Sequence, residues 1–179
     1  MKEIKIETSI QFCQLEELEE NDQQLVRKAI EATKHSYSPY SHFKVGAALR
    51  LANGMELIGA NQENAAYPVG LCAERTAIFA AQANYPDQPI VAIAITAANE
   101  NGLVKKPVTP CGSCRQVMLE IEDRYKQPIK IFLYGTDGVY IINTIKDIMP
   151  LYFVDEAMSF LKFFQGNFLG KQTKFSEMN

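Results

Sequence analysis

The sequence predicts an α/β domain built on a mixed β-sheet with helices packed on it, and three observations lead to this class. The chain has 179 residues, 47% hydrophobic and 22% charged, which suits one domain with a full core and is too short for two of ordinary size. In the second half, β-rich and helical segments alternate. Only residues 135–138 separate the last two β-rich segments, a link too short for a crossover helix. These two strands are therefore expected to be antiparallel neighbours.

The first third of the chain predicts a short strand, a helix and a hairpin. Apolar residues alternate with polar ones over 2–12, as in a strand with one covered face. The next segment, starting near residue 21, has its apolar residues on one helical face, and Asn21 or Asp22 could cap it. Residues 38–41, Ser-Pro-Tyr-Ser, end this helix. Residues 44–51 then read as a buried strand, and Asn53-Gly54 predicts a tight turn to an antiparallel partner over 55–60.

The rest of the chain alternates between helix and strand. The expected elements are a helix over 72–84, a strand over 90–98, a helix over 111–125, and strands over 129–134 and 139–142. The run 90–98 is apolar enough for a central strand. After Pro150, a helix over 154–165 and a frayed tail over 170–179 are expected.

Charge and apolar patterning narrow the classes of function. The net charge is −3, and the 18 basic residues are thinly spread, so no surface for a nucleic-acid backbone is expected. No apolar run reaches the roughly 20 residues of a membrane span, and residues 1–6 lack a signal-peptide core. We therefore expect a cytoplasmic protein that does not bind membranes. In that compartment paired cysteine motifs favour metal over disulfides. Cys13 stands apart, as a bystander.

Three of the four cysteines form two short motifs that together predict one catalytic zinc site. Cys72 precedes Ala73-Glu74-Arg75, and Pro110 precedes Cys111-Gly112-Ser113-Cys114-Arg115. Both motifs fall at predicted helix starts, where partial positive charge stabilises thiolates. Three thiolates leave one coordination position open, as in a hydrolytic zinc site, whereas a structural site would close with a fourth protein ligand. Neither His35 nor His42 has a zinc-ligand spacing to the cysteines.

The residues beside the ligands suggest how the site would work. Glu74 is the candidate general acid/base, placed to move protons beside the metal. Arg75 and Arg115 directly follow the two motifs and could offset the charge of three thiolates by hydrogen bonds to the sulfurs. On helix surfaces the same arginines could instead form ordinary salt bridges. A carboxylate next to the first ligand, with Pro-Cys-x-x-Cys downstream, is typical of zinc nucleobase deaminases.

From about residue 29 to residue 153, the chain resembles the small homotetrameric cytidine deaminases. Four ordered blocks carry the resemblance, namely residues 37–49, 61–67, 72–78 and 110–117. It implies a three-layer α/β/α fold with a mixed five-stranded sheet whose last two strands are antiparallel. It also implies a catalytic domain over 21–153, flanked by an N-terminal extension over 1–20 and a C-terminal helix and tail over 154–179.

The resemblance implies roles for further residues. Phe43 would pack against the base or ribose, Asn61 and Glu63 would hydrogen-bond the ribose 3′-hydroxyl, and backbone groups around Ala73 and Ser113 would touch the pyrimidine. An aromatic near the C-terminus, Phe153 with Tyr152 as the alternative, would reach into a neighbouring subunit's site. Without the resemblance, Phe43 would be assigned to the core, and Asn61 and Glu63 to solvent.

The implied activity is hydrolytic deamination of cytidine and 2′-deoxycytidine to uridine and 2′-deoxyuridine, for pyrimidine salvage. It would use one Zn²⁺ per subunit in a homotetramer whose active sites are shared between subunits. Gln62 stands where the family usually has Ile or Val, and residues 98–107 form an added segment, expected to be a loop. Three alternatives remain: another small aminopyrimidine such as a blasticidin-like antibiotic, a polynucleotide-editing enzyme, and a zinc-stabilised protein without activity.

Overall fold

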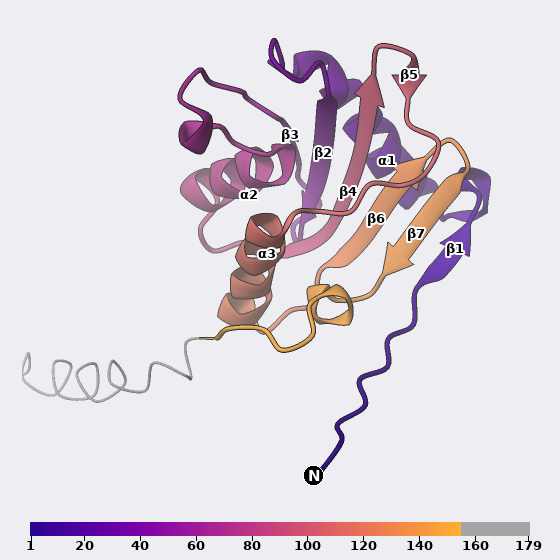
Figure 1. Ribbon diagram of the computed structural model, residues 1–179, viewed down its shortest axis with the longest axis vertical. Coiled ribbons are helices and arrows are strands. Elements are labelled where there is room, and N and C mark those ends of the chain that lie inside the picture. The colour runs from indigo at the N-terminus through magenta and orange to yellow at the C-terminus, as the bar shows by residue number, and fades with distance from the viewer. Residues whose placement is uncertain (155–179) are drawn as a thin grey trace, which may run out of the picture.

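The computed structural model describes residues 1–154 (Figure 1). The expected C-terminal helix and tail, apart from Val154, lie outside the described residues. None of the helices within residues 1–154 is both long and apolar enough to span a bilayer.

The described residues form a mixed sheet in the order β1-β7-β6-β4-β2-β3, with β5 paired to β4 (Figure 1). The strands are β1 Gln11–Cys13, β2 Lys44–Leu51, β3 Glu56–Ala60, β4 Ile90–Asn99, β5 Gly102–Leu103, β6 Lys130–Gly135 and β7 Gly138–Ile142. The central pair β4–β6 is parallel. The pair β6–β7 is antiparallel, with Gly135 opposite Gly138, which confirms the expectation from the short link.

The sheet has seven strands where five were expected, because two short segments add to it. β1 pairs with β7, with Gln11 opposite Ile141. The expected strand over 2–12 is reduced to Gln11–Cys13, since β7 ends at Ile142 and residues further upstream would have no strand to pair with. The second addition is β5, which folds back on β4 within the segment expected to be a loop.

Helices cover both faces of this sheet. The α-helices are α1 Glu20–Ala32, α2 Ala73–Asn84 and α3 Gly112–Tyr125, and the 3-10 turns are η1 Leu15–Glu17, η2 Thr33–His35, η3 Tyr67–Val69 and η4 Ile145–Ile148. In Figure 1, α2 and α3 lie in front of the sheet and α1 lies behind it, so the expected three layers are present. α1 begins after Glu19 rather than at an Asn21 or Asp22 cap. Asp22 is instead buried and pairs with Arg50 at 2.9 Å and Lys130 at 3.1 Å.

Alternation along the strands divides the core into two clusters. Odd-numbered residues of β2, β4 and β6, such as Leu49, Ile93 and Ile131, pack with α2 and α3. Their even-numbered neighbours, such as Ala94 and Phe132, pack with α1 on the other face. This period of two is the geometry of a strand that is buried on both sides.

Two glycines let helices approach the sheet closely, one on each face. A Cβ on Gly59 of β3 would lie 2.4 Å from the carbonyl oxygen of Ala73, in the first turn of α2. A Cβ on Gly46 of β2 would lie 2.1 Å from the carbonyl oxygen of Ala29 in α1. Gly59 therefore sets the position of the α2 N-terminus, where one of the cysteine motifs is located.

Candidate metal centre and adjoining cavity

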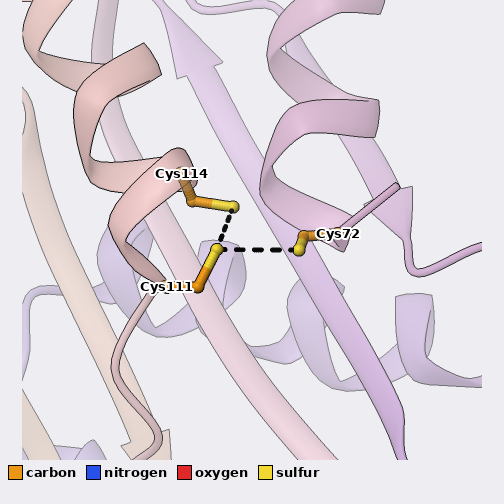
Figure 2. Close-up of side chains that lie close together, drawn as sticks. All are labelled: Cys72, Cys111 and Cys114. Atoms are coloured by element: carbon orange, nitrogen blue, oxygen red, sulfur yellow. Dashed lines mark hydrogen bonds between the residues drawn. The ribbon is translucent and has the colours of Figure 1, made fainter. Parts of the chain in front are cut away.

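The starts of α2 and α3 bring the three motif cysteines together (Figure 2). Cys72 is the N-cap residue of α2, Cys111 is the N-cap residue of α3, and Cys114 lies in the first turn of α3. The Sγ atom of Cys111 is 3.8 Å from that of Cys72 and 3.4 Å from that of Cys114. Segments 39 residues apart in the sequence thus converge on one point.

These thiols fit a zinc ion. Zn–S bonds of about 2.3 Å in a tetrahedral site place the sulfurs about 3.8 Å apart. The ligand atoms of the three cysteines all lie within 4.8 Å of one another, and within residues 1–154 no histidine or carboxylate joins the group. In the described part of the chain these three thiols could hold a metal ion, and a tetrahedral ion held by them would keep one position for water or substrate. His35 and His42 do not take part.

Crowding of the three thiols changes their acidity. The neighbouring Cys114 thiol, followed by Arg75 and Cys111, lowers the pKa of Cys72 to about 5, although burial acts in the opposite direction. The Cys72 sulfur and burial in turn raise the pKa of Cys114. A thiolate on one cysteine thus opposes ionisation of the next, and a bound cation removes this conflict because it favours every thiolate.

Glu74 lies in the first turn of α2, only 4% exposed, and lines the cavity beside the cysteines. Burial, and then the negative charge of Cys72, raise the pKa of its carboxyl group. A raised pKa brings a carboxyl group closer to the range in which it can both take and return a proton.

The two arginines have different partners. Arg75 donates from Nη2 to the Cys72 sulfur at 3.8 Å, the contact expected for an arginine that offsets thiolate charge. Arg115 donates from Nε to the carbonyl oxygen of Pro110 at 2.9 Å and from Nη1 to that of Ile148 at 2.6 Å. Its hydrogen bonds thus hold the loop before Cys111 against η4, and any effect on the thiolates would act through space.

A cavity of about 750 Å³ adjoins the cysteines. Its lining includes Cys72, Cys111 and Glu74 together with Phe43, Asn61 and Glu63, which precede the first cysteine motif in the sequence. Tyr40 and Tyr67, which sequence reasoning did not single out, also line it, with ring centroids 5.9 Å apart in an edge-on arrangement. Both tyrosines fall within the sequence blocks that carry the family resemblance, and this position was the one indication in the sequence that they could belong to the site.

Asn61 and Glu63 hold the segment 36–45 by side-chain hydrogen bonds. Asn61 Oδ1 accepts from Ser36 Oγ at 2.6 Å and from the Val45 amide at 2.7 Å, while its Nδ2 donates to the Phe43 carbonyl oxygen at 2.9 Å. Glu63 accepts from the Ser41 hydroxyl and from two backbone amides. These bonds, that of Ser41 first, lower the pKa of the Glu63 carboxyl group.

The remaining expected site residues lie around this centre but do not line the cavity. Ala73 is fully buried beside Cys72, and Ser113 lies between Cys111 and Cys114. Phe153 is 58% exposed, and its carbonyl oxygen accepts from Gln116 Nε2 at 3.0 Å. The Tyr152 ring lies 5.6 Å from Lys146 Nζ. The two aromatic side chains thus have no place in the cavity of their own chain.

Comparisons with known proteins agree with this geometry. Residues 19–127 match the family model described as the cytidine and deoxycytidylate deaminase zinc-binding region. The chain is 41% identical over 137 residues to a cytidine deaminase of Halalkalibacterium halodurans, covering 76% of this chain and 97% of the relative. It is 35% identical to one of Sporosarcina psychrophila, covering 77% and 95%. The crystal structure of cytidine deaminase from Burkholderia pseudomallei aligns with a TM-score of 0.62 at 38% identity, covering 73% and 97%.

Proposed function

The chain belongs to the cytidine and deoxycytidylate deaminase family, which binds zinc, and we propose on this basis that it hydrolyses the exocyclic amine of cytidine and 2′-deoxycytidine. The products are uridine or 2′-deoxyuridine and ammonia. The observation that carries the proposal is the cavity that Glu74 shares with the cysteine cluster and with Asn61 and Glu63. The lining of this cavity thus includes groups suited to a hydrolytic reaction and groups suited to a hydroxyl-bearing ligand.

The buried carboxyl group of Glu74 carries the proton transfers. Zinc held by Cys72, Cys111 and Cys114 would act as a Lewis acid and make water easier to deprotonate. Glu74 takes a proton from the attacking water and delivers protons to ring nitrogen N3 and to the leaving amine. Arg75, through its contact with Cys72, offsets part of the negative charge of three thiolates.

The charges of the cavity favour a free nucleoside over a nucleotide. Among the described residues that line it, Arg75 is the one Lys or Arg side chain, and it is directed at Cys72. Glu63 and Glu74 contribute negative charge. A 5′-phosphate would meet no free cation there and would be repelled by these carboxylates. This argues against deoxycytidylate, and likewise against a polynucleotide.

The proposal also covers where the protein works in the cell and how its subunits assemble. We propose a cytoplasmic homotetramer with one zinc per subunit, in which Phe153, or Tyr152, enters the cavity of a neighbouring subunit. The exposure of Phe153 at the surface of its own chain supports this. Residues 21–153 would form the catalytic domain, with 1–20 and 154–179 as additions, and the products would feed pyrimidine salvage.

The test is turnover with and without metal. We expect the purified, zinc-loaded protein to convert cytidine to uridine, followed by ultraviolet absorbance, and to lose this activity to a strong chelator. Zinc alone should restore it. Cytidine 5′-monophosphate is the matched control, and it should turn over at least about 100-fold more slowly, as expected for an unpaired charge in the cavity. Bound zinc without turnover of either nucleoside would contradict the proposal and favour another aminopyrimidine or a purely structural zinc.

A further inference from the structure

We propose that Ser41 is a positioning residue of this site, whose hydroxyl group joins Glu63 to Phe43 and so holds the carboxylate and the ring that face the nucleoside. This inference rests on the proposed function, because Glu63 and Phe43 are taken there as nucleoside contacts. Ser41 itself lines the cavity beside both residues.

The Ser41 hydroxyl group makes two hydrogen bonds at once. It donates to Glu63 Oε1, and it accepts from the Phe43 amide at 3.1 Å. The other carboxylate oxygen, Glu63 Oε2, accepts from the Tyr40 amide at 2.9 Å and from the Ser41 amide at 3.2 Å. One serine thus supplies two of the three donors to Glu63 and the acceptor for Phe43.

The turn around Ser41 lies outside regular secondary structure. Residues 38–43 lie outside the strands, Ser41 is exposed, and His42 adopts a left-handed conformation with φ of 55°. The backbone bond within the turn is that from the His42 amide to the Ser38 carbonyl oxygen, 3.1 Å long. Hydrogen bonds to a carboxylate are stronger than those between neutral groups. Three of the four hydrogen bonds between this turn and residues 61–63 are those to Glu63, and the fourth joins Asn61 Nδ2 to the Phe43 carbonyl oxygen.

These contacts also decide which hydrogen bonds remain for a ligand. A carboxylate can accept about four hydrogen bonds, and Glu63 has three. Asn61 Oδ1 already accepts two, so Asn61 can offer a ligand only its second Nδ2 hydrogen. The pair is thus set to donate from Asn61 and to accept at Glu63. A hydroxyl group matches this pattern because it can accept one bond and donate the other.

Phe43 is the second residue that depends on Ser41. Its amide donates to the Ser41 hydroxyl, and its carbonyl oxygen accepts from Asn61 Nδ2 at 2.9 Å. The backbone of Phe43 is thus fixed on both sides by side chains of the same cluster. Loss of the Ser41 hydroxyl would free one side and let the ring, which is 37% exposed, move relative to the cavity.

The test compares Ser41→Ala and Ser41→Thr with Ser9→Ala, a matched control in the exposed N-terminal segment. We expect Ser41→Ala to raise KM for cytidine about 10-fold and to change kcat less than about threefold, since one charge-assisted hydrogen bond is lost away from the reacting atoms. Ser41→Thr keeps the hydroxyl group and should stay within about threefold of the wild-type KM. In a Glu63→Gln background, Ser41→Ala should raise KM by a smaller factor than in the wild type, because the hydrogen bond that it removes there joins two neutral groups.

A second measurement does not depend on turnover. Amide hydrogen exchange of peptides covering 39–44 should be faster in Ser41→Ala than in the wild type, and unchanged in Ser9→Ala. Unchanged exchange, or fully additive effects of Ser41→Ala and Glu63→Gln on KM, would overturn the proposed role of Ser41. If the wild type itself fails to deaminate cytidine, the proposed function fails, and the exchange result still decides whether Ser41 holds this turn.

Discussion

Two equally buried carboxylates have different surroundings, and we therefore assign them different roles. Glu74 and Glu122 are each 4% exposed. Glu122 accepts from the Ile129 and Ile145 amides, both at 2.9 Å, and from the Thr144 hydroxyl at 2.6 Å. It thereby ties the end of α3 to the start of β6 and to η4. Glu74 instead lines the cavity, and burial raises the pKa of its carboxyl group.

We predict that replacing Glu74 by Gln affects mainly kcat, whereas replacing Glu122 by Gln affects mainly stability. Glu74→Gln should lower kcat by about 10²- to 10⁴-fold, the usual contribution of a general acid/base, while bound zinc and the melting temperature change little. Glu122→Gln should leave kcat of the folded enzyme near that of the wild type and cost about 1–3 kcal/mol of unfolding free energy. Steady-state kinetics, metal analysis and urea unfolding measure these effects. Near-normal kcat in Glu74→Gln would remove it from the proton transfers.

At the scale of elements, the site depends on how closely α2 approaches the sheet. The α2 N-terminus carries Cys72 and Glu74, and Gly59 of β3 leaves room for its first turn. Gly46 does the same for α1 on the opposite face, away from the cysteines. A methyl group added at either glycine would therefore meet helix backbone in a similar way, but only the helix beside Gly59 carries Cys72 and Glu74.

We expect Gly59→Ala and Gly46→Ala each to destabilise the fold by about 1–3 kcal/mol, because the added methyl group meets backbone atoms. Gly59→Ala should in addition weaken zinc binding and lower kcat, since the displaced first turn of α2 carries Cys72 and Glu74. Competition with a chromophoric chelator and kinetics at a temperature where both variants are folded would test this. Equal zinc affinity and kcat in the two variants would show that α2 can shift without disturbing the site.

At the scale of the whole molecule, one chain brings together the three cysteines and the described lining of the cavity, and its Phe153 is exposed outside that lining. Gln116 Nε2 of α3 holds the Phe153 carbonyl oxygen, and Arg115 Nη1 holds that of Ile148. The end of the described chain is therefore fixed to the helix that carries Cys111 and Cys114. The exposed side chain of Phe153 remains available for the neighbouring-subunit role that we propose for it.

Subunit mixing tests this sharing. Glu74→Gln and Phe153→Ala, unfolded and refolded together, should give more activity than the mean of the separate variants. In the mixed assembly some sites combine an intact Glu74 with an intact Phe153 from the partner. Variants refolded separately and then combined serve as the control. Activity equal to the mean, in an assembly shown to contain both chains, would contradict a role of Phe153 in the neighbouring site.

The sequence by itself determined the features that depend on local pattern. The alternation of β-rich and helical segments and the short link between the last two strands predicted a mixed sheet, and the structure confirms it. The two cysteine motifs predicted a three-thiol cluster, and the structure brings it together. Helix bounds differed by one residue at Cys72 and Cys111, because these residues cap their helices.

Only the tertiary structure decided which distant groups meet. The number of strands depended on β1 finding β7, a contact between opposite ends of the domain that no local pattern encodes. In the same way, the sequence left Arg115 open between the sulfurs and a salt bridge, and the fold instead directs it to the carbonyl oxygens of Pro110 and Ile148. The fold likewise lets the Ser41 hydroxyl group join Glu63 to Phe43. Periodicity and motif spacing are properties of neighbouring residues, whereas a hydrogen-bond partner is chosen by whichever polar group the completed fold places within reach.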